Sequence, residues 1–239
     1  MNVLIPMAGL GKRLGIEKYG TIKPLIMING APIIEHTIRS LKIDGNFIFV
    51  LLKNKFSSEL KEKLQLIVQD SKIIEVENLT NGPAESCLAA RKYINNDDEL
   101  LIANSDQVMF WNSENFLLEA REREISGSVV TYISNSLKNS YAKVDKSGYV
   151  KEIQEKKLIS NFALVGVHYF RRGRDFVKSA LKMINENNRS SGEFYVGPSY
   201  NYIIREGGLI KSYMIEGGQH YPIGTPEDLE IYKENFGNL

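Results

Sequence analysis

Short apolar runs rich in β-branched residues alternate with stretches whose apolar residues recur at helical spacing. The apolar runs predict strands at 2–6, 47–52, 72–77, 99–103 and 127–134. The periodic stretches predict helices over 31–41, 57–68 and 83–93. Because helices that alternate with strands connect parallel neighbours, this order predicts an α/β fold: a mainly parallel, Rossmann-like central sheet flanked by helices.

The second half of the chain has a different pattern. Two short strands, 141–144 and 149–154, flank Asp145-Lys146-Ser147-Gly148, which is typical of a hairpin turn. A strand, two helices, a strand and a terminal helix follow, predicted at 163–170, 174–185, 196–205, 209–214 and 226–236. Thr225 is placed to cap the last helix. With no repeat or linker, residues 1–239 are predicted to form one domain with two lobes, about 1–110 and about 111–239.

The most informative motif follows the first predicted strand. It reads Gly9-Leu10-Gly11-Lys12-Arg13, and Lys23-Pro24-Leu25 comes ten residues later. The backbone of a glycine loop can close around phosphates, and two spaced cations can neutralise them. The spacing fits neither the dinucleotide fingerprint nor the Walker loop. A plain tight turn is the simpler alternative for this loop taken alone.

This opening resembles the signature of the sugar-phosphate nucleotidyltransferases. The resemblance implies a nucleotide-diphospho-sugar transferase fold and transfer of a nucleotidyl group from a triphosphate to a phosphorylated acceptor, with release of pyrophosphate. It implies that Arg13 holds the leaving phosphates and that Lys23 bridges the α-phosphate and the attacking oxygen. The nucleotide-binding loop would consist of Met7, Ala8, Gly9, Leu10, Gly11 and Lys12.

Two further motifs belong to the predicted nucleotide-binding lobe. Asn81-Gly82-Pro83-Ala84-Glu85-Ser86 combines a turn with a helix start, and the resemblance places the base against Gly82, Pro83, Glu85 and Ser86. A plain helix start is the alternative.

Ser105 and Asp106 follow a predicted strand, where parallel sheets place their sites. Ser105 is expected to contact nucleotide. A carboxylate with triphosphate oxygens is the usual Mg²⁺ site, so Asp106 is the candidate metal ligand, with a turn-capping Asp as the alternative.

The second lobe carries the residues that the resemblance assigns to the acceptor. They are Tyr141, Glu155, Lys156, Asn161 and Glu193. Taken alone, the charged run at 155–157 would be a solvated turn.

Two family positions are altered in this chain. The Asp that often supplies a second metal contact is replaced by Pro222, and an arginine that contacts the acceptor phosphate in thymidylyl members is replaced by Ser191. These departures favour an acceptor other than a common hexose phosphate.

Composition narrows the class of protein. The hydrophobic fraction is 43%, the charged fraction is 25% and the net charge is +1, which is ordinary for a globular protein and gives no field that would recruit nucleic acid or membrane. The single cysteine rules out an intrachain disulfide and favours a reducing compartment. His36, His168 and His220 have no metal-binding spacing. A cytoplasmic enzyme that can form a homodimer is expected.

The glycine loop does not indicate which nucleotide base is bound. Gly-Pro-Ala-Glu-Ser-Cys-Leu, Asn-Ser-Asp-Gln and Gly-Glu-Phe-Tyr-Val resemble a branch associated with capsule and surface-polysaccharide synthesis, for which CTP is the first choice and dTTP, UTP and GTP follow. Two other functions stay open. A glycosyltransferase would need two acids in an Asp-x-Asp arrangement, and 104–106 offers one. A non-catalytic nucleotide-binding domain is favoured by the loss at Pro222.

Overall fold

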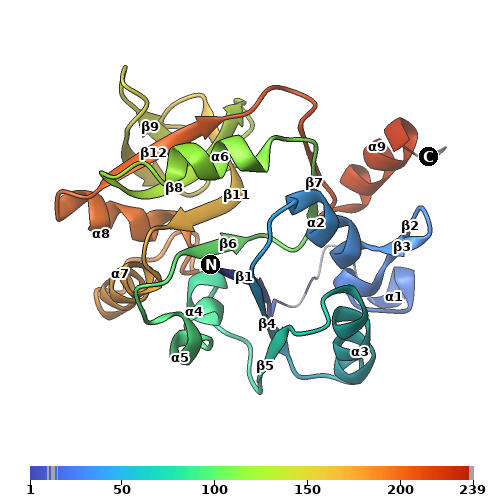
Figure 1. Ribbon diagram of the computed structural model, residues 1–239. Coiled ribbons are helices and arrows are strands. Elements are labelled where there is room, and N and C mark those ends of the chain that lie inside the picture. Colours follow the sequence, from blue (N-terminus) through green and yellow to red (C-terminus); the bar gives the residue numbers. More distant parts are fainter. Residues whose placement is uncertain (10, 12–13, 15, 237–239) are drawn as a thin grey trace.

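The computed structural model describes all residues except 10, 12, 13, 15 and 237–239. In the described residues, a nine-stranded sheet has the strand order β10-β9-β11-β6-β1-β4-β5, with β8 paired to β11 and β12 paired to β8 (Figure 1). Four neighbouring strands are parallel: β6 (Leu100–Ala103), β1 (Asn2–Met7), β4 (Asn46–Leu52) and β5 (Lys72–Val76). This part of the sheet confirms the predicted parallel arrangement.

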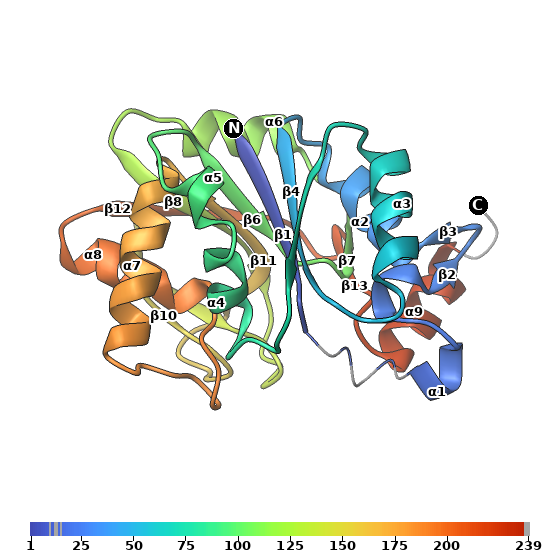
Figure 2. The ribbon, with the colours of Figure 1, turned by 90° about the horizontal axis from the view of Figure 1, so that it is seen from below.

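Helices cover both faces of the parallel strands (Figure 2). The helices α2 (Ile33–Leu41), α3 (Ser57–Ile67) and α6 (Ser113–Ala120) lie on one side, while α4 (Pro83–Leu88), α5 (Arg91–Ile94) and α7 (Gly173–Asn185) lie on the other. Successive residues of a strand point to opposite faces. Accordingly, Val3 and Ile5 pack with α2 and α3, whereas Leu4 packs with α4 and α7.

The second half of the chain adds a mixed extension to the same sheet. It contains β8 (Ile125–Ile133), β9 (Tyr141–Val144), β10 (Val150–Gln154), β11 (Phe162–Phe170) and β12 (Leu209–Met214). β11 is antiparallel to β6, β8 and β9, while β12 is parallel to β8. One further helix, α8 (Tyr200–Arg205), follows a 3₁₀ turn, η3 (Gly197–Ser199), and packs on β10 and α7. All five strands lie within two residues of their predicted positions.

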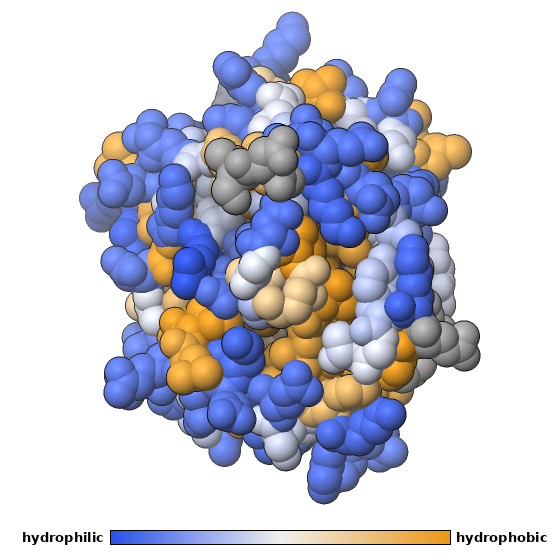
Figure 3. All heavy atoms as spheres, turned by 90° about the vertical axis from the view of Figure 1, so that its right-hand side faces the viewer, coloured by the Kyte–Doolittle hydropathy of each residue, from blue (hydrophilic) through white to orange (hydrophobic). Residues whose placement is uncertain are grey.

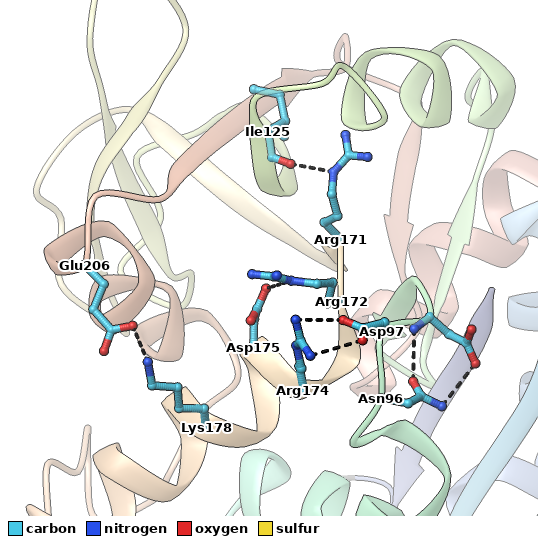
Figure 4. A network of polar contacts seen from close by, with 10 residues as sticks. Asn96, Asp97, Ile125, Arg171, Arg172, Arg174, Asp175, Lys178 and Glu206 are labelled. Atoms are coloured by element: carbon cyan, nitrogen blue, oxygen red, sulfur yellow. Dashed lines mark hydrogen bonds and ion pairs between the residues drawn. The ribbon is translucent and has the colours of Figure 1, made fainter.

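Exposed ion pairs connect α7 to neighbouring segments of the chain. Arg174 at the start of α7 pairs with Asp97 at 2.9 Å, and Lys178 on the same helix pairs with Glu206 at 2.7 Å (Figure 4). Such pairs contribute about 0–1 kcal/mol each because water screens them. The buried face of α7, which includes Phe176, Ala180 and Met183, therefore supplies most of the stabilisation of this helix.

Several short elements have no pattern of their own in the sequence. They are α1 (Ile16–Tyr19), η2 (Lys23–Leu25), β2 (Met27–Ile28), β3 (Ala31–Pro32), β7 (Gln107–Met109), β13 (His220–Pro222) and the longer α6. The predicted helix at 31–41 begins only at Ile33, because Ala31 and Pro32 pair with β2. The predicted helix at 83–93 ends at Leu88 and resumes at Arg91.

The C-terminal helix α9 (Pro226–Phe236) begins where it was predicted, and the backbone N–H of Asp228 donates to Thr225 Oγ1 at 3.2 Å. On this side of the molecule, hydrophobic residues gather among hydrophilic ones (Figure 3). Met27 on β2 and Ile231 on α9 are each more than half exposed. Across the described residues, no helix combines the length and the apolar character that crossing a bilayer requires.

A partly buried carboxylate joins three elements of the fold. Glu99, just before β6, accepts hydrogen bonds from Arg121 Nε at 2.7 Å and from Tyr169 Oη at 2.8 Å. The hydrogen bond from Arg121 is the largest cause that holds the pKa of Glu99 below its usual value. A lowered carboxyl pKa stabilises the folded state above the unfolded pKa, and this stabilisation disappears as the pH falls through the folded pKa.

We therefore predict a pH-dependent effect of Glu99→Gln. At pH 7 the variant is expected to lose about 1–2 kcal/mol of unfolding free energy, because hydrogen bonds to a charged group are lost. The difference from wild type should close as the pH falls below about 4. Urea denaturation at both pH values measures this, with the exposed Glu62→Gln on α3 as control. A difference that does not change with pH would contradict the assignment.

Candidate active site

A cavity of about 810 Å³ opens at the carboxyl ends of β1, β4 and β6. Ligands in open α/β sheets bind at this edge. The structure brings most of the predicted nucleotide-site residues to its wall, from segments far apart in the chain. Those that line it are Met7, Ala8, Gly9, Gly11, Lys23, Gly82, Pro83, Ser86, Ser105 and Asp106, and the predicted acceptor residue Glu193 joins them.

The predicted catalytic lysine is held at the centre of this wall. Lys23 Nζ forms an ion pair with Asp106 Oδ2, and the two side chains are 15% and 24% exposed. Lys23 opens the 3₁₀ turn η2, and Asp106 lies between β6 and β7. Gly11 has a φ of +58°, and a Cβ there would lie 3.3 Å from Lys23 Cβ, so the glycine loop packs directly on the lysine stem. Leu10, Lys12 and Arg13 lie outside the described residues.

Gly224 is a site residue that the sequence interpretation did not assign. The backbone N–H of Ile223 donates to Asp106 O at 2.8 Å, which seats the 220s segment against the ion pair. A Cβ on Gly224 would lie 2.6 Å from Asp106 Oδ2 and 3.4 Å from Lys23 Nζ. The sequence signal was a glycine directly before Thr225, the predicted cap of the last helix. A side chain at this position would therefore displace the Asp106 carboxylate from its present place beside Lys23.

The turn before α4 depends on Gly82. Its φ is +130°, and a Cβ would lie 2.6 Å from both the backbone N and O of Phe194. Phe194 N–H donates to Asn81 O at 2.8 Å, and Ala84 N–H donates to Phe194 O at 2.9 Å. The close approach lets two backbone segments pair edge to edge, and this pairing brings Glu193 to the cavity.

We predict that Gly82→Ala destabilises the protein by about 2–4 kcal/mol, because the methyl group combines backbone strain with a backbone clash. Gly148→Ala is the matched control, since Gly148 also has a positive φ (+84°) but an added Cβ would have no atom within 4 Å. Urea denaturation of both variants measures the loss of unfolding free energy, and the difference between the two losses gives the cost of the clash with Phe194. Equal losses in the two variants would show that the clash with Phe194 is relieved at no cost.

The other two residues of this motif have different positions. Ser86 is buried and lines the cavity, and its hydroxyl lies 2.6 Å from Thr80 Oγ1. The Glu85 carboxylate instead turns back to its own loop and accepts a hydrogen bond from Asn81 Nδ2 at 2.9 Å. Contact between Glu85 and a base stays a prediction, while its hydrogen bond stabilises the turn.

Glu155 lines a second, smaller cavity of about 170 Å³ that shares Pro6, Pro83 and Asn104 with the first. Its carboxylate accepts a hydrogen bond from Ser140 Oγ, and burial raises its pKa above the usual value. The neighbouring Lys156 Nζ donates to Tyr195 Oη at 2.8 Å. Glu155 therefore lies beside the large cavity, and Lys156 contacts a residue that lines the smaller one.

The structure does not bring Tyr141 and Asn161 to either cavity. Tyr141 is fully buried in β9, and its hydroxyl donates to Ser136 O at 2.8 Å. Asn161 is exposed before β11, and its carbonyl accepts a hydrogen bond from Ser134 N at 3.0 Å. Strand alternation turns the Tyr141 ring into the core, so a contact with acceptor needs a rearrangement of this segment.

Sequence reasoning missed the outer wall of the large cavity. Its additional residues come from the ends of β4 and β5 and from the start of α3: Leu52, Asn54, Lys55, Phe56, Leu60, Leu79 and Thr80. Asn54 Oδ1 accepts from Phe56 N at 2.8 Å, which fixes the turn between β4 and α3. The signal was weak, because a polar residue after a strand is typical of any turn.

Asp106 can serve as a metal ligand only if a bound substrate supplies the other ligands of the ion. Within the described ranges, no three His, Cys, Asp or Glu side chains come together as a metal site. Pro222, at the position of the lost family Asp, is exposed and pairs with Gln107. Mg²⁺ is often bound by one or two carboxylates plus substrate phosphates. The donor set therefore suits a magnesium ion that arrives with a triphosphate.

The burial of Cys87 argues against a nucleophilic role for its thiol. Its side chain is fully buried on α4, and burial raises the pKa of its thiol far above the usual range. A thiol in such surroundings is inert.

Comparison with protein families decides the classification. The nucleotidyl transferase family matches residues 3–230. The chain belongs to this family. It is 27% identical over 203 residues to the bifunctional protein GlmU of Thermosipho melanesiensis, and the aligned region covers 82% of this chain and 42% of the relative. It is 25% identical over 232 residues to GlmU of Methanocaldococcus jannaschii, covering 96% and 52%. The chain thus spans about half the length of the curated relatives it matches.

Solved structures confirm the predicted fold class. The nucleoside-diphosphate-sugar pyrophosphorylase of Vibrio cholerae RC9 superposes with a TM-score of 0.83 at 21% identity, covering 97% of this chain and 99% of the other. The inositol-1-phosphate CTP transferase of T. maritima gives 0.75 at 17% identity, covering 97% and 93%. The CTP:phosphocholine cytidylyltransferase of Streptococcus pneumoniae gives 0.73 at 18% identity, covering 98% of each chain. At these sequence identities, the structural similarity shows the fold alone.

Proposed function

We propose that this protein transfers a nucleotidyl group from a nucleoside triphosphate to a phosphorylated small molecule and releases pyrophosphate. The observation that carries the proposal is the Lys23–Asp106 pair, set in the large cavity against the glycine loop. A cation and a carboxylate at one point of a cavity large enough for a whole ligand suit charge neutralisation during phosphoryl chemistry. Family membership supports the same reaction class.

In this reaction the protein would position the reactants and neutralise the charge on their phosphates. The acceptor phosphate is already an anion near neutral pH, so it attacks the α-phosphorus without a general base while pyrophosphate leaves. Lys23 would orient the α-phosphate and the attacking oxygen. Arg13, by its place in the sequence, would hold the leaving phosphates. Asp106 would hold Mg²⁺, which neutralises charge on the phosphates when bound.

CTP is the proposed triphosphate and CMP the transferred group, for a capsule or surface-polysaccharide precursor. The capsule-branch motifs support this choice, as do two solved structures of the same fold that are named as CTP enzymes.

The choice of CTP is tested by thermal unfolding with Mg²⁺ and each of CTP, UTP, dTTP, GTP and ATP. A triphosphate at 100 times its dissociation constant should add about 2.7 kcal/mol of stability. A larger shift with another base would reassign the nucleotide, and no shift with any would remove the transferase proposal.

A non-catalytic nucleotide-binding domain is the second candidate, because Pro222 removes a carboxylate that could hold metal. Turnover separates the two candidates: a domain that only binds would be stabilised by triphosphate and would release no pyrophosphate. The glycosyltransferase alternative predicts instead that a nucleotide sugar is consumed without any triphosphate.

A homodimer stays part of the proposal. The exposed apolar residues on β2 and α9, Met27 and Ile231, give that face a surface that a second copy could cover. Sedimentation equilibrium measures the mass directly. A monomer at all concentrations would remove the dimer and leave the proposed reaction unaffected.

A further inference from the structure

Three consecutive residues connect the walls of the two cavities with the core. Glu193 lines the large cavity, and Tyr195 lines the smaller one. Phe194 lies between them, and its side chain is 2% exposed and packs in the core. Such alternation of side-chain direction is typical of extended backbone. The seat of the Phe194 ring therefore determines where Glu193 stands in the cavity wall.

A tight turn leads the chain into this segment. Ser190 N–H donates to Glu193 O at 2.9 Å, and Glu193 N–H donates to Ser190 O at 3.0 Å. The two central residues, Ser191 and Gly192, have φ values of +50° and +85°. Positive φ at both central residues is typical of tight hairpin turns, but it strains a serine. A Cβ added to Gly192 would meet no described atom within 4 Å, so the tip of the turn gains little from packing.

The side chain of Arg189 joins this turn to the Phe194 ring. Its guanidinium carbon lies 4.2 Å from the centre of the ring, which is within the range of a cation–π interaction. Nη1 donates to Gly192 O at 3.0 Å, and Nε donates to Asn187 Oδ1 at 2.7 Å. A planar guanidinium can stack on a ring and donate hydrogen bonds in its own plane at the same time. Arg189 thus holds the turn from both sides.

The same guanidinium reaches the turn before α4. Arg189 Nη1 lies 3.4 Å from Asn81 Oδ1, beside the backbone hydrogen bond from Phe194 N–H to Asn81 O at 2.8 Å. In the described part of the chain, the polar partners of Arg189 are all neutral oxygens, and Arg189 lines neither of the two cavities. Its contacts therefore act on the geometry of the two turns.

We propose that Arg189 is a positioning residue that holds the turn at 190–193 against Phe194 and the turn before α4, and thereby fixes the Glu193 carboxylate in the wall of the large cavity. That Glu193 serves the reaction rests on the proposed function. Arg189 acts on the substrate through Glu193 and makes no contact with the substrate itself.

Amide hydrogen exchange tests the positioning without any substrate. In Arg189→Ala, the amides of Glu193 and Phe194 are expected to exchange at least about tenfold faster, because the turn opens more easily. The amide of Ile215, which follows β12 and donates to Thr131 O at 2.8 Å, should exchange as in wild type. Unchanged exchange at Glu193 and Phe194 would overturn the proposal, because the turn would then be held without Arg189.

A double-mutant cycle tests whether Arg189 acts through Glu193. The measurement is the initial rate of pyrophosphate release with Mg²⁺, a mixture of small phosphate esters and the triphosphate that stabilises the chain most. Arg189→Ala is expected to lower this rate about tenfold in the wild-type background and to have little further effect in Glu193→Gln. Equal effects of Arg189→Ala in the two backgrounds would overturn the proposal, as would a normal rate in Glu193→Gln alone.

Two further variants separate geometry from charge. Arg189→Lys keeps the charge and loses the planar fork, so it should be as slow as Arg189→Ala. A normal rate in Arg189→Lys would show that charge alone matters and would overturn the proposal. Arg205→Ala is the matched control, because Arg205 on α8 also lies over a ring, 5.0 Å from the centre of Tyr202, and lines neither of the two cavities. Its rate should equal that of wild type.

The two measurements distinguish failure of this inference from failure of the proposed function. A chain that releases no pyrophosphate but shows faster exchange at Glu193 in Arg189→Ala loses the proposed function, and the positioning of Glu193 by Arg189 is supported. A chain that releases pyrophosphate but shows independent effects of Arg189 and Glu193 loses this inference alone.

Discussion

Replacing Lys23 with alanine is expected to lower kcat for pyrophosphate release at least about 10²–10³-fold while the protein stays folded. The ammonium is mostly buried in the large cavity and is aimed at Asp106. Removing a preorganised charge of this kind removes stabilisation that exists mainly in the transition state. The turn itself should persist, because its hydrogen bonds, such as Leu25 N–H to Ile22 O at 2.9 Å, are made by backbone.

Lys53→Ala is the matched control for this variant. Lys53 is also ion-paired, to Glu77 at 2.8 Å, but its side chain is 56% exposed and does not line the large cavity. Its loss should leave kcat unchanged. Steady-state kinetics and thermal unfolding of both variants are the measurements. Near-normal turnover in Lys23→Ala would remove Lys23 from the mechanism.

Gly224→Ala is expected to lower kcat/KM about 10²-fold with little loss of stability. The new methyl would lie 2.6 Å from Asp106 Oδ2, so the Lys23–Asp106 pair must move. Misplacement of reacting groups by about 1 Å costs about that factor. No backbone strain is expected, because Gly224 does not have a positive φ.

Gly217→Ala provides the control for this substitution. Gly217 lies in the loop before β13, has no positive φ and has nothing within 4 Å of an added Cβ. It should behave as wild type in kinetics and in denaturation. Equal activity of the two variants would show that the ion pair tolerates displacement, and the proposed role of its geometry would then be wrong.

The sequence predicted the parallel half of the fold well, because each strand there is a continuous apolar run. Val3, Leu4 and Ile5 are buried on both faces of the sheet, and that pattern does not depend on distant contacts. The pairing of β7 with β13 could not be predicted this way. Each is three residues long, and their pairing is set by residues more than 100 positions apart.

The candidate site was predictable where backbone motifs define it and less so where side-chain direction does. The glycine loop, Lys23 and Asp106 were assigned by spacing, and the described ones meet in one cavity. Tyr141 was assigned by motif position, but its ring lies in the core. The position of His168 on the wall of the smaller cavity could not be predicted, because one histidine in an apolar strand gives no signal.

The fate of the α- and γ-phosphates of CTP tests the central claim most directly. The protein would be incubated with Mg²⁺, a mixture of small phosphate esters, and CTP labelled at either the α- or the γ-phosphate. We predict that the α-label enters a new product joined to the acceptor, that the γ-label leaves in pyrophosphate, and that Lys23→Ala does neither at a comparable rate. A γ-label found in orthophosphate or on the acceptor, or no product from CTP, UTP, dTTP or GTP, would contradict nucleotidyl transfer.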